Sequence, residues 1–169
     1  MESKLRKEIR QTKPFVCMEE EAHLNIARTA AAIEHRFGEV FKEFGITPTQ
    51  YNALRILRGA GEKGLFRNEI RDRLIAQVPD ATRLLDRLAE LSLVSRIRDE
   101  GDRRHVNTRI TKRGLQMLDD LEKPVIDGHR NHFKGMSRAE MQTLIDLMER
   151  IRETCIKACA SGNESGVGS

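Results

Sequence analysis

The residue types best suited to chemistry gather in the segment 102–111, whose sequence is DRRHVNTRIT. Two short runs with the β-branched, alternating character of strands, Val94 to Arg98 and His105 to Ile110, flank a charged turn that contains Gly101. This pattern predicts a β-hairpin with arginines at its tip. Arginines placed this close together repel one another, so we expect a polyanion to lie against them.

Basic charge is concentrated in this hairpin rather than spread along the chain. The chain has 169 residues, a net charge of +4 and 33% charged residues. Between Val94 and Arg113, seven basic residues stand against three acidic ones, an excess that equals the net charge of the whole chain. A positive stripe confined to one element is typical of a surface that contacts phosphate, and a solvated charged face is the plainer alternative.

Helical periodicity surrounds the hairpin on both sides. Apolar spacing and the capping residues Thr47, Thr111 and Ser137 predict six helices, over residues 15–44, 48–59, 67–74, 79–91, 112–133 and 138–160. Pro124 is expected to interrupt the fifth helix and to kink it. In the sixth, apolar residues recur from Met141 to Ala158 at alternating spacings of three and four, as in a helix that packs on another helix. Helices followed by a basic hairpin have the order of a winged helix-turn-helix.

Four short motifs follow one another through the centre of the chain. They are Thr82-Arg83-Leu84-Leu85-Asp86-Arg87-Leu88, Leu93-Val94 with Arg96, Gly101-Asp102-Arg103-Arg104, and Ile110-Thr111 followed by Gly114. In this order and spacing they resemble the MarR family of bacterial and archaeal transcription regulators, over roughly residues 20–155. Two positions depart from the family pattern: Ser92 replaces a glycine, and Pro79-Asp80 replace a serine or threonine. Because serine favours the left-handed conformation less than glycine does, we expect a differently built turn at Ser92.

The resemblance implies a mainly α fold with a small β-hairpin wing. A winged helix-turn-helix core over 46–111 would be flanked by dimerisation helices over 15–45 and 112–160, in a single domain spanning 15–160. An obligate homodimer would place a recognition helix in the major groove and a wing in the minor groove at each half of a palindromic DNA site. The expected function is that of a cytoplasmic, sequence-specific transcription regulator, a repressor released by a small phenolic or amphipathic effector. Residues 1–14 are expected to form a flexible or loosely docked lead, and residues 161–169 a disordered tail.

The expected DNA contacts lie on the recognition helix, in the turn before it and on the wing. Arg83 is the candidate for guanine, because its planar fork pairs with O6 and N7 together; a solvated helix arginine is the alternative. Arg104 suits a narrow minor groove. Asp80 either accepts from a cytosine amino group or, as we favour, braces Arg83 or Arg87. Phosphate, base or bracing contacts are assigned to the other candidates, Arg67, Gln77, Thr82, Arg87, Arg96, Asp102 and Arg103.

The sequence indicates an effector site less clearly than it indicates the DNA-binding residues. We expect a cleft in which polar groups meet a carboxylate or a phenol between apolar walls. Its expected residues are Ile33, His35, Arg36, Phe37, Tyr51, Leu54 and Arg55. For His35 and Arg36, a place facing water or the dimer partner is an equally good interpretation.

The three cysteines, an odd number without framework spacing, indicate a reducing compartment. Cys17 suggests a redox-sensing regulator as an alternative, because some members of the family sense peroxides through one cysteine near the start of the first helix. The glutamates at positions 19–21 oppose this role, since nearby negative charge raises the pKa of a thiol. Cys155 and Cys159, four residues apart on one predicted helix, are more typical of small packing residues.

No metal site, cofactor or enzyme active site is expected. His129 and His132 share one predicted helix, and His23, Glu34 and His35 share another, but zinc needs three or four converging ligands. The sequence lacks a glycine-rich phosphate loop, a His-Glu-x-x-His motif and a nucleophile beside a base. It also lacks an apolar run of about 18 residues that would span a membrane. A winged helix used only as a protein-binding adaptor remains an alternative, which the arginine-rich hairpin tip disfavours.

Overall fold

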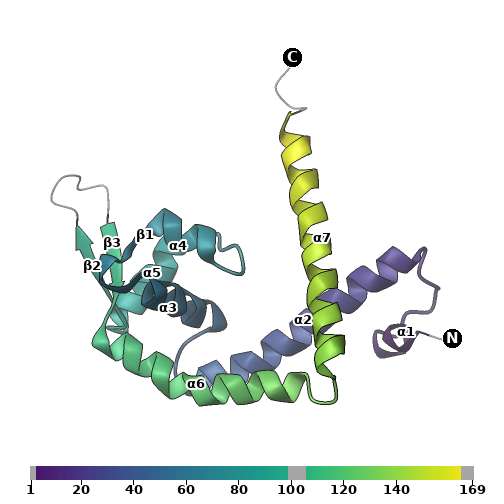
Figure 1. Ribbon diagram of the computed structural model, residues 1–169, viewed down its shortest axis with the longest axis horizontal. Coiled ribbons are helices and arrows are strands. Elements are labelled where there is room, and N and C mark those ends of the chain that lie inside the picture. Colours follow the sequence, from purple (N-terminus) through teal and green to yellow (C-terminus); the bar gives the residue numbers. More distant parts are fainter. Residues whose placement is uncertain (1–2, 99–105, 165–169) are drawn as a thin grey trace. The chain divides into compact units, whose positions relative to one another are not determined.

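The computed structural model describes the backbone of residues 3–98 and 106–164, and the side chains of residues 3–97 and 106–157. The elements follow one another as α1 (Lys4–Glu8), α2 (Met18–Glu43), α3 (Pro48–Ala60), the 3₁₀ helix η1 (Gly61–Lys63), β1 (Leu65–Phe66), α4 (Arg67–Arg73), α5 (Ala81–Glu90), β2 (Val94–Arg98), β3 (Val106–Ile110), α6 (Lys112–His132) and α7 (Arg138–Glu164) (Figure 1). This confirms the predicted fold class, mainly α with a small β wing. The chain divides into two compact units, Met1–Gly128 and His129–Ser169. The predicted single domain with flanking dimerisation helices stays a prediction.

Side-chain caps fix where several helices begin, as the sequence predicts. Before α3, the Thr47 hydroxyl accepts from the Gln50 amide at 3.2 Å, and the Gln50 side chain accepts from the Thr47 amide at 2.8 Å. Before α6, the Thr111 hydroxyl accepts from the Gly114 amide at 3.0 Å. Each cap satisfies backbone N–H groups that a helix cannot pair internally, so these residues mark helix starts.

Three predicted boundaries differ from the structure. Residues 1–14 are not simply a lead, because α1 forms there and the Leu5 side chain is buried, with 4% of its surface exposed. Helix α6 continues through Pro124 to His132 instead of being interrupted. Helix α7 extends to Glu164, past the predicted start of the tail at 161, and residues 165–169 lie outside the described part of the chain.

The sheet holds one strand more than the predicted hairpin. Its order is β1-β3-β2, and both pairings are antiparallel, with Leu65 opposite Thr108 and Val94 opposite Ile110. Gly64, with φ +65°, leads into β1, and a Cβ there would lie 2.7 Å from the Thr108 carbonyl oxygen. A glycine is therefore required where the chain enters the sheet.

One core holds the helix-turn-helix and the sheet together. Its completely buried apolar side chains come from α3 to α6 and the loop before β2: Leu54, Leu57, Ile70, Leu85, Leu88, Leu93, Leu118 and Leu121. Burying each such side chain contributes about 1.5–3 kcal/mol. Helix α2 joins this core through Phe41, whose ring centroid lies 4.8 Å from that of Tyr51 on α3. The orientation of α5 is thus set by its packing against α4 and β2 within this core.

The second unit leaves its apolar residues largely uncovered. In α7, no side chain between residues 138 and 157 is buried, and Ile145, Leu147, Ile151 and Ile156 are exposed. Met141, Leu144 and Met148 of the predicted seam are half-buried, whereas the side chain of Ala158 lies outside the described residues. None of the helices in the described part of the chain is long and apolar enough to cross a membrane.

Candidate nucleic-acid interface

Helix α5 presents a polar face while its apolar face is buried. Asp80, rather than Pro79, precedes the helix directly, and its carboxylate accepts from the Arg83 backbone amide at 3.0 Å. This carboxylate holds the backbone of the helix, and the preferred role of Asp80, bracing the side chain of Arg83 or Arg87, stays a prediction. Leu85 and Leu88 face the core, and Arg83 and Arg87 are exposed on other faces of the helix.

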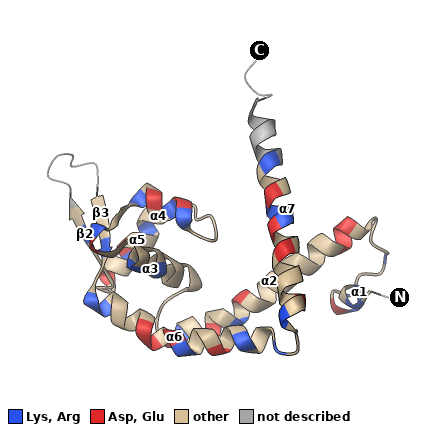
Figure 2. Cartoon of the chain, viewed as in Figure 1, with Lys and Arg blue, Asp and Glu red and all other residues tan. Residues whose placement is uncertain are grey.

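Thr82 contacts Arg67, and Arg83 follows Thr82 in the chain. Arg67, on the first turn of α4, donates from Nη1 to the Thr82 hydroxyl at 3.2 Å, which brings two predicted contact residues from separate helices together. The Arg83 guanidinium makes no hydrogen bond or ion pair with another residue in the described ranges. It is exposed, so this side chain is available to an external acceptor. Basic residues recur on α4, α5, β2 and β3, around the helix-turn-helix (Figure 2).

Two other predicted contact residues are held by acidic partners. Arg87 pairs with Glu90 at 2.8 Å on the same helix. Arg96 on β2 pairs with Asp86 on α5, and their side chains are 29% and 50% exposed. The Arg96–Asp86 pair ties the wing to α5, so Asp86 is a positioning residue that was not among the predicted contact residues. Asp86 belongs to the motif Thr82–Leu88, but the sequence does not indicate its partner, because Arg96 comes close only when β2 packs beside α5.

The turn between α4 and α5 has an anchor that the sequence did not reveal. The Asn52 side chain, on α3, accepts from the Ile75 backbone amide at 2.9 Å. Gln77, the predicted contact residue in this turn, is exposed. Because Asn52 and Ile75 are 23 residues apart, no local pattern indicates their contact.

The turn after α5 overturns one expectation. Ser92 adopts φ +60°, in the left-handed region, so the turn has the conformation for which the family pattern uses glycine. The Leu93 amide donates to the Leu88 carbonyl at 3.0 Å, and the Ser92 amide donates to the Ala89 carbonyl at 2.8 Å. These bonds close a Schellman-type turn. The Thr111 hydroxyl donates to the Ser92 carbonyl at 2.8 Å, which secures the turn from the start of α6.

The wing tip itself is not part of the described structure. Asp102, Arg103 and Arg104 lie outside the described residues. Strands β2 and β3 pair in antiparallel fashion, as predicted, from Val94 opposite Ile110 to Arg98 opposite Val106. The roles of the three tip residues stay predictions.

The expected effector residues do not share one environment. Phe37 and Leu54 are buried in the core, whereas His35 and Arg36 are exposed. Tyr51 is half-buried, and the Arg55 guanidinium carbon lies 5.9 Å from the centre of its ring, within cation–π range. Ile33 on α2 is half-buried, and Arg55 on α3 is exposed. This effector cleft stays a prediction.

Cys17 is an exposed residue at the start of α2, and its side chain makes no capping bond. The pKa of Glu19 is held below its ordinary value, first by a backbone hydrogen bond and then by a hydrogen bond from the Cys17 side chain. The redox alternative stays a prediction. Cys155 is exposed, and the side chain of Cys159 lies outside the described residues. In residues 3–98 and 106–164, no three metal-ligating side chains converge, His129 and His132 included.

Comparisons with known proteins agree with this architecture. A family model described as MarR family matches residues 44–105. A MarR transcription factor from Planctomyces limnophilus is 38% identical, with 80% of this chain and 98% of that protein covered and a TM-score of 0.65. The chain belongs to the MarR family. This membership confirms the resemblance inferred from the motifs between Thr82 and Gly114.

Two further relatives are similar to this MarR-family chain, one a curated transcription regulator and one a solved structure. The regulator PecS from Dickeya dadantii is 24% identical over 129 residues, covering 76% of this chain and 78% of PecS. A mutant MarR from E. coli, solved in complex with operator DNA, is 21% identical with a TM-score of 0.70, covering 89% of this chain and 99% of that one. Its MarR-family relatives make this chain a DNA-binding transcription regulator with a winged helix-turn-helix, and not an enzyme.

Proposed function

We propose that this MarR-family regulator is a homodimeric repressor in the cytoplasm, which binds a palindromic operator and releases it when a small molecule binds. The observation that carries the proposal is the exposed Arg83 guanidinium on a helix whose start is capped by Asp80. A capped helix whose arginine has no side-chain partner among the described residues fits the readout of a guanine edge in the major groove. One such contact is worth about 1–3 kcal/mol of discrimination between base pairs.

The neighbouring residues would place α5 on the DNA backbone. Arg67 and Thr82, joined by a hydrogen bond, offer one cation and one hydroxyl beside Arg83 and suit a phosphate. The wing would extend the contact into the minor groove, with Arg104 in a narrow A·T-rich segment and Arg103 on phosphate. Asp102 would hold a tip guanidinium. The Asp86–Arg96 pair supports this arrangement because it fixes the base of the wing to α5.

Two long helices support the homodimer. Of the 26 residues of α2, two, Phe37 and Phe41, are buried, and Met18 and Ile26 are exposed. Helix α7 exposes four large apolar side chains, among them Ile156 at 68%. Apolar surface left uncovered on long helices is typical of an interface between copies of one chain. Two recognition helices related by a two-fold axis would then read the two halves of a palindrome.

Footprinting on the DNA upstream of the regulator's own gene tests this proposal. A dimer predicts protection of two half-sites whose centres lie about 10 base pairs, or a multiple of that, apart. Repression predicts that transcription from the overlapping promoter falls in vitro when the regulator is added and recovers with an effector. Protection of a single half-site by a monomer would contradict the dimer, and rising transcription would contradict repression.

A further inference from the structure

The turn between α4 and α5, residues 75–79, carries Gln77 and leads into the start of α5. Leu74, the residue after α4, is extended, with φ −66° and ψ 139°, and its half-buried side chain packs against the core. The chain then projects from α4 as a loop before it returns to α5 (Figure 1). The conformation of this loop therefore determines the position of Gln77.

Burial contributes little to holding this turn. Ile75 has 89% of its surface exposed, and Ala76, Gln77 and Pro79 are also exposed. Val78 is half-buried. A segment with so little buried apolar surface gains little free energy from packing, so its conformation depends on its hydrogen bonds.

Asn52 makes the hydrogen bond that ties this turn to the helices around it. The Asn52 side-chain oxygen accepts from the Ile75 amide at 2.9 Å. Among the residues that the structure describes, no other hydrogen bond reaches residues 75–79. Asn52 is half-buried on α3, and the next two residues, Ala53 and Leu54, are completely buried. One side chain on a helix anchored in the core thus holds the turn.

Helix α5 is held by other contacts. Leu85 and Leu88 are completely buried, and Asp80 caps the first turn by accepting from the Arg83 amide at 3.0 Å. None of these contacts involves Asn52. Loss of the Asn52 bond would therefore release residues 75–79 and leave Arg83 in place.

We propose that Asn52 is a positioning residue for DNA readout, a role that rests on the proposed operator binding. It holds the turn 75–79 so that Gln77 meets the operator, and it needs no DNA contact of its own. A released turn would have to be ordered each time DNA binds, and the entropy cost of that ordering would lower affinity. With the bond in place, the turn is ordered when the chain folds.

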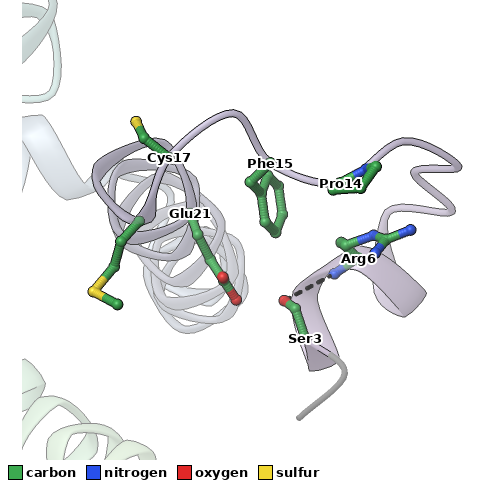
Figure 3. A pocket seen from close by; sticks show the side chains of 7 residues that line it. Ser3, Arg6, Pro14, Phe15, Cys17 and Glu21 are labelled. Carbon is green, nitrogen blue, oxygen red and sulfur yellow. Dashed lines mark hydrogen bonds between the residues drawn. The ribbon is translucent and has the colours of Figure 1, made fainter.

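Four variants isolate this role. Asn52→Ala removes the acceptor, whereas Asn52→Asp retains an oxygen that can accept from the Ile75 amide. Asn25→Ala is a control matched in residue type, at an exposed position of α2. Ser3→Ala is a control matched in bond type, because the Ser3 hydroxyl accepts from the Arg6 amide at 3.4 Å at the start of α1 (Figure 3). Both controls leave the turn 75–79 unchanged.

Amide hydrogen exchange of the full-length protein, followed by NMR without DNA, tests the anchor. We expect the Ile75 amide to exchange about three- to tenfold faster in Asn52→Ala, the factor that one net hydrogen bond supplies. Asn52→Asp should retain most of the protection of Ile75, and the two controls should retain all of it. Unchanged exchange of Ile75 in Asn52→Ala would overturn the proposal. An equal rise at the Leu85 amide would also overturn it, because that rise would show general destabilisation.

A double-mutant cycle with Gln77→Ala tests the role in DNA readout, with operator affinity measured by fluorescence anisotropy. Asn52→Ala should weaken operator binding about three- to tenfold. In the Gln77→Ala background it should have almost no effect, because the contact that Asn52 positions is already absent. In the Arg83→Ala background its effect should be undiminished, since α5 is held independently of the turn.

Two results of this cycle would overturn the positioning role. They are full additivity of Asn52→Ala with Gln77→Ala, and an unchanged operator affinity of Gln77→Ala alone. If the unaltered protein bound operator and scrambled DNA equally, the proposed operator binding would fail, and this role of Asn52 with it. A protein that selects its operator but gives an additive cycle would refute the role of Asn52 alone.

Discussion

Asp80 offers a sharp test because two substitutions separate its structural role from a role in DNA readout. Its carboxylate accepts from the Arg83 amide at 3.0 Å and thereby caps α5. Asp80→Ala removes this bond and should lower the free energy of unfolding by about 1 kcal/mol. For a chain of this size, the melting temperature should fall by about 2–4 °C. Asp80→Asn retains an acceptor of equal capping strength, so its cost should stay below about 0.5 kcal/mol, mostly from the lost charge at the helix N-terminus.

DNA binding should respond differently to the same two changes. A carboxylate at the start of α5 would lie near the phosphates and repel them, so Asp80→Asn should bind operator DNA more tightly at low salt. The gain should shrink at physiological salt, where charges are screened over about 8 Å. The assays are urea unfolding at one fixed protein concentration, as the proposed dimer would require, and fluorescence anisotropy with labelled DNA.

Two results would refute the reasoning on Asp80. If Asp80→Asn were as destabilised as Asp80→Ala, the carboxylate would be doing something other than capping. If Asp80→Asn were fully stable but lost affinity for the operator, and recovered it on a site with a changed cytosine, the carboxylate would contact a base amino group.

Three further changes have expected outcomes. Ser92→Gly should stabilise the chain by about 0.5–1 kcal/mol, because φ +60° is strained for serine but not for glycine; urea unfolding measures this, and a destabilised variant would contradict it. Gly114→Ala should lower the free energy of unfolding by at least about 2 kcal/mol, because the added Cβ would lie 2.3 Å from the Leu93 carbonyl oxygen. Its control is Gly59→Ala, where the added Cβ meets open space, and this change should stabilise α3 by up to about 1 kcal/mol. The pKa of Glu140 is lowered by hydrogen bonds from the Ser137 amide and hydroxyl, so the stabilisation it provides is present above the unfolded pKa and is lost as pH falls through the folded pKa. Ser137→Ala should return this pKa towards its ordinary value in an NMR titration, and an unchanged pKa would assign the shift to the amide alone.

The helices and caps were predictable because their signals are local. Thr47 and Thr111 lie immediately before the helices that they cap, and Ser137 is three residues from Glu140. The apolar repeat of α5 likewise follows from spacing along a single helix. The predicted start of α5 at residue 79 is two residues early, because Pro79 and Asp80 are both common at helix starts. The hydrogen bond from the Arg83 amide identifies Asp80 as the cap.

The parts that escaped prediction depend on contacts between distant segments. Asn52 reaches Ile75, and Asp86 reaches Arg96, only after α3, α4, α5 and β2 have packed. Strand β1 is two residues long and takes its pairing from β3, so no alternation reveals it. The polar character of Arg67 and Thr82 suggested DNA contact for each, but their hydrogen bond required the folded arrangement.

Equilibrium binding of the full-length protein to its own upstream DNA, by fluorescence anisotropy over a range of salt concentrations, tests the central claim. The unaltered protein should bind that DNA more tightly than a scrambled sequence, with an affinity that falls steeply as salt rises. Arg83→Ala should lose about 1–3 kcal/mol of binding free energy and discriminate less between operator variants, whereas Arg28→Ala, on α2, should behave like the unaltered protein. Equal binding to both sequences, with no difference between Arg83→Ala and Arg28→Ala, would contradict operator readout through α5.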